Sequence, residues 1–154
     1  MKPISMKQKD NIWGFSIDIA IFRREVIVLF TNSKEYLMEE LESVLSEDLG
    51  MESKYANDFS KVLVESLKEE EPFPLGLTYE LESMDNGKEA FVIFNGTPKN
   101  VPKDVVIHEM YHAMRKICND RGVDDEETEA YMLEYLCHEV FESIANFNKK
   151  DNKT

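Results

Sequence analysis

The feature that most constrains the fold of this chain is the presence of two pairs of strand-like segments, each followed by helical segments. From Phe15 to Ile21 apolar residues alternate with small or polar ones, which is the period of a half-buried strand. The run EVIVLF follows after Arg23, so the two runs predict a hairpin with a charged turn. GLTYELES and EAFVIFN predict a second hairpin around Asn86 and Gly87, a pair that suits a tight turn.

The remaining segments repeat at helical spacing. Between the hairpins, one helix is predicted to begin near Asn32 and to stop at Gly50, and a second to end before Pro72. After the second hairpin, helices are predicted over about residues 103–120 and 125–147. The order predicts a small α+β domain over residues 1–154, with a mostly antiparallel sheet and the last two helices packed together. Residues 1–11 and 148–154 are predicted to be frayed tails.

Charge and apolar content exclude several classes of function. The chain has 31 acidic and 18 basic residues in 154, a formal net charge of −13, which disfavours nucleic acid and anionic membranes as partners. No apolar run has the length of a membrane span or the features of a signal peptide. Cys118 and Cys137 lie in helical patterns, so we expect reduced thiols and a cytoplasmic protein. The oligomeric state cannot be inferred from the sequence.

The segment VVIHEMYHAM, residues 105–114, carries the clearest chemical pattern. His108 and His112 lie one helical turn apart, with Glu109 beside them. They fall opposite an apolar stripe formed by Val106, Met110, Ala113 and Ile117. Two imidazoles at this spacing can bind one Zn²⁺, and Glu109 could take a proton from metal-bound water. The alternative is a pair of ordinary surface histidines on an amphipathic helix.

A catalytic zinc ion needs a third protein ligand besides the two histidines. The chain turns at Arg121 and Gly122 and returns with an acidic helix. The candidates there are Asp124, Asp125, Glu126, Glu127, Glu129, Glu134 and His138. Glu127 is close to the turn, and Ala130 on its side would let the two helices approach. Glu127 could instead form a capping pair with Asp124, in which case it would stabilise the helix end and bind no metal.

The motif His108-Glu109-x-x-His112 followed by Glu127-x-x-Ala130-Tyr131 resembles the zincin metallopeptidases whose third zinc ligand is a glutamate on the next helix. It is most similar to small metallopeptidases encoded by phages and prophages, over roughly residues 90–140. The resemblance implies a minimal zincin-like fold. It also implies that His108, His112 and Glu127 bind Zn²⁺ and that Glu109 is the general base.

Two further expectations accompany this resemblance. Larger relatives often carry an aspartate where this chain has Tyr131, and a phenol there could stabilise an oxyanion, support a ligand or simply pack. AFVIF, residues 90–94, could be an exposed sheet edge that pairs with an extended substrate, or a core strand.

The sequence therefore predicts a zinc-dependent hydrolase, in particular a metallopeptidase acting on a peptide or protein substrate. The alternative is a non-catalytic zinc-binding module, such as a phage accessory or interaction protein, in which a structural metal braces the last two helices. A third alternative is that the last two helices pack together and bind no metal.

Overall fold

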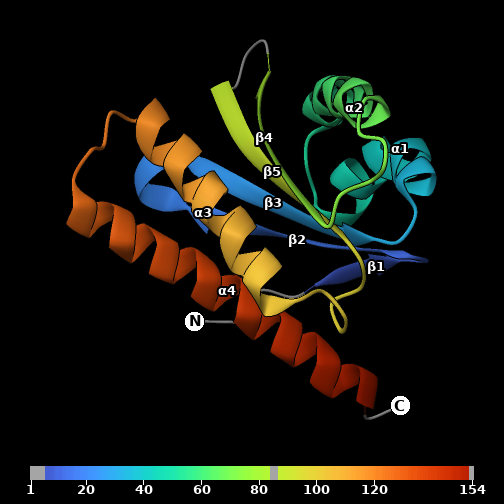
Figure 1. Ribbon diagram of the computed structural model, residues 1–154. Coiled ribbons are helices and arrows are strands. Elements are labelled where there is room, and N and C mark those ends of the chain that lie inside the picture. The colour runs from blue at the N-terminus through green and yellow to red at the C-terminus, as the bar shows by residue number, and fades with distance from the viewer. Residues whose placement is uncertain (1–5, 84–86, 153–154) are drawn as a thin grey trace.

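The computed structural model describes residues 6–83 and 87–152, in which five strands form one mixed sheet and four α-helices cover it (Figure 1). The strands are β1 (Lys7–Lys9), β2 (Ile12–Ile19), β3 (Arg24–Thr31), β4 (Gly76–Ser83) and β5 (Gly87–Asn95). The helices are α1 (Lys34–Ser43), α2 (Ser53–Lys68), α3 (Lys103–Asp120) and α4 (Glu126–Asn152). The predicted α+β class is confirmed.

The strand order across the sheet is β1-β2-β3-β5-β4. The pairs β1–β2, β2–β3 and β4–β5 are antiparallel, whereas β3 and β5 are parallel, with Val26 opposite Ala90. The sheet is therefore mostly antiparallel, as predicted, and both predicted hairpins form. Asn86, in the predicted tight turn of the second hairpin, lies outside the described residues.

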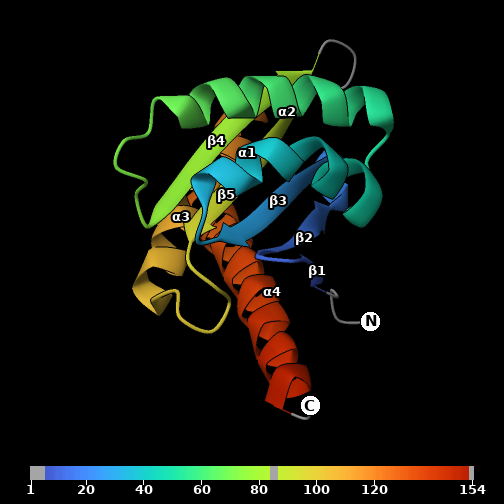
Figure 2. The same ribbon diagram turned by 90° about the vertical axis from the view of Figure 1, so that its right-hand side faces the viewer.

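Helices cover both faces of the sheet (Figures 1 and 2). Alternate residues of β3 point to opposite sides, so Ile27 and Leu29 pack with α1 and α2, and Val28 packs with α3 and α4. Because β5 is covered on both sides, its AFVIF run is buried throughout and needs no alternation. Each face thus has its own apolar cluster.

Local signals set the helix ends between the hairpins. The hydroxyl of Ser33 accepts a hydrogen bond from the Tyr36 N–H at 3.1 Å, so α1 is capped one residue after the predicted Asn32. A π-helical segment, η2 (Val44–Asp48), extends α1. The chain then leaves the helical path at Gly50, whose φ of 75° is costly for any residue with a side chain.

The turn between β2 and β3 differs from the prediction. β2 ends at Ile19, and a short 3-10 turn, η1 (Ala20–Phe22), leads to Arg23 at φ 54°. Ile21, which the alternation placed on the core side, is 83% exposed because the chain leaves the strand path before reaching it. The alternation of apolar residues does not predict the residue at which a strand ends.

Both predicted tails are wrong over part of their length. Asp10, at φ 51°, turns the chain back so that Lys7–Lys9 pairs with β2 as strand β1. At the other end α4 continues to Asn152, because no glycine or proline interrupts it and Lys149 and Lys150 suit the negative end of its dipole. Within the described residues, no helix has the length and apolarity needed to cross a membrane.

Candidate metal centre

The helix α3 carries the two histidines and packs on one face of the sheet. Its predicted apolar stripe is confirmed, since Val106, Met110, Ala113 and Ile117 are all buried against the sheet and α4. Asp104 lies in the first turn, where a negative charge suits the helix dipole. The helix ends before Gly122, at φ 70°, so the chain can reverse into α4.

His108 and His112 converge on the exposed side of α3. Their Nε2 atoms lie 3.0 Å apart, and the ring centroids are separated by 4.6 Å. This approach follows from the four-residue spacing, which places both side chains on the same helix face. Without a metal, one ring can donate its N–H to the other, with the roles set by the tautomers.

Glu109 is buried, although its place beside the two histidines in the sequence predicted the exposed side of α3. Only 5% of the residue is exposed, and Oε1 accepts a hydrogen bond from the Thr78 hydroxyl at 2.7 Å. Its second oxygen, Oε2, lies 3.9 Å from Nε2 of His108. A β-carbon added to Gly76 would stand 2.7 Å from Cγ and 2.9 Å from Oε2 of Glu109. Glu109 is therefore held between β4 and the histidine pair.

A hollow of about 280 Å³ adjoins this carboxylate. Pro74, Leu75 and Gly76 form one side, and Asp104, Val105, His108 and Glu109 form the other. Neither Thr78 nor Gly76 was predicted as a site residue. Nothing near them in the sequence marks them, because they reach Glu109 only through the packing of α3 on β4.

The edge strand beside the histidine helix is β4, so of the two alternatives for AFVIF the exposed sheet edge is excluded. Strand β5 lies between β3 and β4 and pairs with both. The reading of AFVIF as a core strand is the correct one, since Ala90, Phe91, Val92, Ile93 and Phe94 are all buried. Parallel pairing of β3 with β5 is what moves β4 outward, and that pairing joins segments far apart in the chain.

The structure does not bring Glu127 to the histidine pair. Within the described residues, no group of three or more His, Cys, Asp or Glu side chains is arranged to hold a metal. Glu127 is exposed in the first turn of α4. An ion pair joins Arg115 of α3 to Glu129 of α4, and from there α4 runs back past α3 (Figure 1).

The start of α4 is capped, but by a different pair from the one expected. The Asp125 carboxylate accepts hydrogen bonds from the Glu127 N–H at 3.4 Å and the Thr128 hydroxyl at 2.7 Å. The hydrogen bond from Thr128 contributes most to lowering the pKa of Asp125, and the bond from the Glu127 N–H lowers it further. Glu127 is thus not needed as the side-chain cap that the pairing with Asp124 suggested.

The other candidates on α4 lie away from the pair or in contact with other groups. The buried face of α4 contains Met132, Leu136 and Val140, whereas Ala130 is exposed, so Ala130 does not mediate close helix packing. Tyr131 is 68% exposed and lines a different hollow, against Asp18–Phe22. His138 pairs with Glu142 at 2.8 Å, as an ordinary surface histidine does, and Glu134 is exposed.

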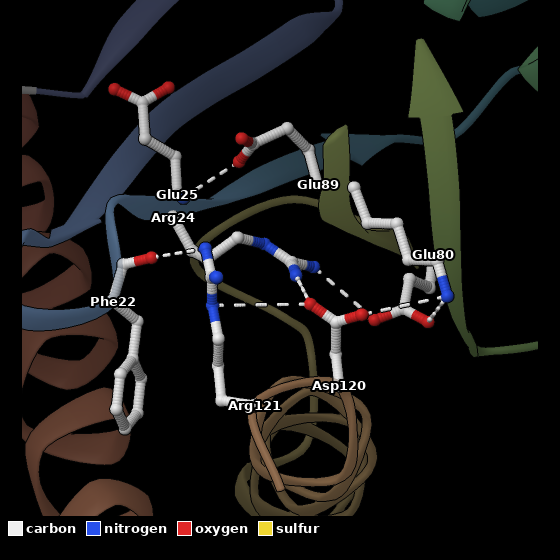
Figure 3. Close-up of polar contacts among 8 residues, drawn as sticks. Phe22, Arg24, Glu25, Glu80, Glu89, Asp120 and Arg121 are labelled. Carbon is white, nitrogen blue, oxygen red and sulfur yellow. Dashed lines mark hydrogen bonds and ion pairs between the residues drawn. The ribbon is translucent and has the colours of Figure 1, made fainter. Parts of the chain in front are cut away.

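A charge network around the buried Arg24 fixes the far end of α3 to the sheet (Figure 3). Arg24, 2% exposed at the start of β3, forms ion pairs with Asp120 of α3 and with Glu80 of β4, the latter at 3.2 Å. Lys88 of β5 adds a contact to Asp120 at 3.5 Å. Thr78 therefore holds the middle of α3 through Glu109, while Arg24 holds its C-terminal end.

Glu89 lies beside this network and accepts a hydrogen bond from the Glu25 N–H at 2.7 Å (Figure 3). Burial raises the pKa of Glu89 to about 7, although the hydrogen bond and the charge of Arg24 oppose the rise. The carboxyl of Glu89 is thus poised to change its charge near neutrality. The sequence marks neither Arg24 nor Glu89 as a site residue, because burial of a charged residue leaves no local signal.

Comparison with known proteins adds no assignment to this geometry. No protein-family model matches the chain, and no match was found among curated proteins or among solved structures.

Proposed function

We propose that this chain is a zinc-dependent hydrolase that cleaves peptide bonds. In this proposal His108 and His112 hold the metal through their Nε2 atoms, Glu127 is the third ligand, and Glu109 is the general base. The role of Glu127 rests on the sequence resemblance and on its place close to the turn before α4, and an oxyanion role for Tyr131 rests on the chemistry of its phenol.

The observation that carries the proposal is the convergence of the two imidazoles. Two nitrogens at about 2.0–2.1 Å from one tetrahedral zinc ion would stand roughly 3.3 Å apart. The Nε2 atoms of His108 and His112 are 3.0 Å apart on the exposed face of α3, so a small adjustment of either ring suits a shared ion. The donor set also fits, because neutral imidazole is a preferred zinc ligand.

The second support is the position of Glu109. Zn²⁺ bound by the two histidines would supply Lewis-acid chemistry that polarises a carbonyl and acidifies water. Thr78 holds Oε1 of Glu109, which leaves Oε2, the oxygen 3.9 Å from the His108 ring nitrogen, as the atom to take the proton. Burial and the close approach of β4 at Gly76 restrict the carboxylate to this orientation.

One observation favours the alternative of a non-catalytic zinc module. Glu109 is buried and hydrogen-bonded to the neighbouring strand, which is also how a carboxylate with a purely structural role is held. In that case zinc on the two histidines would only stabilise the fold, and Glu109 would only tie α3 to β4.

Zinc binding tests the metal assignment first. The chain, saturated with zinc and dialysed, is expected to retain about one ion, as measured by elemental mass spectrometry. His108→Ala and His112→Ala should each lose most of that metal. His138→Ala is the matched control, since its side chain is 68% exposed against 66% for His108, and it should keep the ion. Retention of the metal by the His108→Ala and His112→Ala variants would contradict the proposal.

Hydrolysis tests the catalytic assignment separately. The zinc-loaded wild type is incubated with a mixed library of unstructured peptides, and new termini are detected by mass spectrometry. Cleavage that disappears with His108→Ala and persists with His138→Ala supports the peptidase. Full zinc content without any cleavage favours the non-catalytic module.

A further inference from the structure

A second hollow, of about 380 Å³, lies between the turn η1 and the first half of α4, apart from the histidine pair. We call it the η1–α4 groove. One wall comes from the hairpin end and the other from α4, and they include Asp18, Ile21, Phe22, Tyr131, Met132 and Tyr135. The hydroxyl of Tyr135 donates to the Asp18 carbonyl oxygen at 2.8 Å, so the two walls are tied together.

This groove gathers the most exposed large apolar side chains of the described chain. Ile21 is 83% exposed and Tyr131 is 68% exposed, and Tyr135 beside them is 37% exposed. Ile21 is exposed because η1 turns it away from the core that its neighbours in β2 enter. Apolar side chains gathered in one hollow, in place of single scattered ones, mark a surface that binds another molecule.

Asp18 is the one acid that lines the groove, and further acids lie next to its lining residues in the chain or in the sheet. Asp18 in one wall lies directly opposite Glu25 in the strand register, and both are exposed. Like charges so placed destabilise a strand pair, and the pKa of Glu25 is raised, mainly by desolvation and then by the charge of Asp18. On the other side four exposed acids, residues 124–127, lead into the first turn of α4. Arg23 at the tip and Arg121, which donates to the Phe22 carbonyl, only partly offset these charges.

We propose that the η1–α4 groove binds a short amphipathic helical segment of a partner protein, with apolar anchors on one face and lysine or arginine on the other. The apolar anchors would cover Ile21 and Tyr131. The basic side chains would relieve the repulsion between Asp18 and Glu25, and the tyrosine ring faces add favourable sites for a cation. A second copy of the chain suits the groove less well, because two copies that each carry a net charge of −13 repel each other.

The test uses a synthetic peptide of about 14 residues, roughly four helical turns, with leucines on one face and lysines on the other. A scrambled peptide of the same composition is the ligand control. Fluorescence anisotropy should show the amphipathic peptide binding at least about tenfold more tightly than the scrambled one. The amide NMR shifts caused by binding should centre on residues 18–22 and 128–135.

Matched variants separate the groove from general charge attraction. Ile21→Ser and Asp18→Asn should each weaken binding about fivefold or more. Val62→Ser, at a residue 45% exposed on α2, and Glu52→Gln, at another exposed acid, should leave it unchanged. All four positions are exposed, so circular dichroism should show wild-type folding.

Three results would overturn the proposal. The first is equal binding of the scrambled peptide, or equal losses in the control variants, which would indicate attraction to net charge alone. The second is no saturable binding up to about 1 mM peptide. The third is a wild-type dimer in sedimentation velocity that Ile21→Ser converts to a monomer, which would assign the groove to a second copy of the chain.

Discussion

A β-carbon on Gly76 would collide with the side chain of Glu109, at 2.7 Å from Cγ and 2.9 Å from Oε2. The strand β4 and the histidine-bearing helix α3 thus approach as closely as they do only because residue 76 has no side chain. The contact places a carboxylate oxygen next to the two imidazoles, and it makes Gly76 the most direct way to disturb Glu109 without replacing it.

Gly76→Ala is expected to displace the Glu109 carboxylate and to lower hydrolytic activity at least about tenfold, with a stability loss of about 1–3 kcal/mol from overpacking. Activity against the peptide library and chemical denaturation measure the two effects. Gly14→Ala is the matched control, because its β-carbon would meet Leu29 at 2.9 Å but lies on β2, away from Glu109. Equal activity in the two variants would argue against a role for the close contact.

Glu109→Gln separates an enzyme from a metal-binding module. The amide keeps the size of the side chain and can still accept from Thr78, but it cannot take a proton, so the rate should fall at least about 10²-fold. Zinc content and melting temperature should barely change. Glu89→Gln, at an acid of nearly the same burial but distant from the histidines in the sheet, should remain active. If both variants cleave peptides at the wild-type rate, Glu109 is not the base.

Glu127→Gln tests the third ligand. If Glu127 binds zinc, the affinity measured by competition with a chelator should fall strongly, by about tenfold or more. Glu126→Gln, in the same exposed first turn, is the control for helix-end effects, which should stay below about 1 kcal/mol. Wild-type affinity in the Glu127 variant would move the third ligand to Glu134 or to another acid of α4.

Periodicity and spacing predicted much of this molecule, but only where neighbours in sequence decide the outcome. The apolar stripe of α3 and the convergence of His108 and His112 follow from the geometry of a single helix. The burial of Glu109 does not, because it depends on β4, whose place at the sheet edge is fixed by the long-range pairing of β3 with β5. Whether a strand lies at the edge or in the centre depends on the whole sheet, so it cannot be inferred from a single run such as AFVIF.

Arg24→Met should destabilise the fold by about 3 kcal/mol, because it leaves Asp120 and Glu80 without their buried cation. Arg115→Met removes an ion pair whose arginine is 39% exposed, so it should cost about 1 kcal/mol or less. Urea denaturation of both variants measures the difference. Equal losses of stability in the two variants would mean that the buried ion pairs of Arg24 stabilise the fold no more than the exposed pair of Arg115.

Glu89 makes stability depend on pH. Its pKa is raised from 4.5 to about 7 in the folded chain, so between these values the folded state holds more protons than the unfolded state. The free energy of unfolding should therefore fall as the pH rises from about 5 to 7, relative to Glu89→Gln, which lacks the titrating group. Denaturation of both proteins across this range measures the difference, and parallel curves would contradict the raised pKa.

The parallel pair at the centre of the sheet also has a consequence for how the chain reaches its fold. The hairpins β2–β3 and β4–β5 join neighbouring segments, but Val26 meets Ala90 only after α1, α2 and β4 have been accommodated between them. Closing so long a loop is costly in chain entropy, and contacts between segments far apart in the chain slow folding. The two hairpins should therefore form early and dock late, and the contact between Thr78 and Glu109 should be among the last to appear.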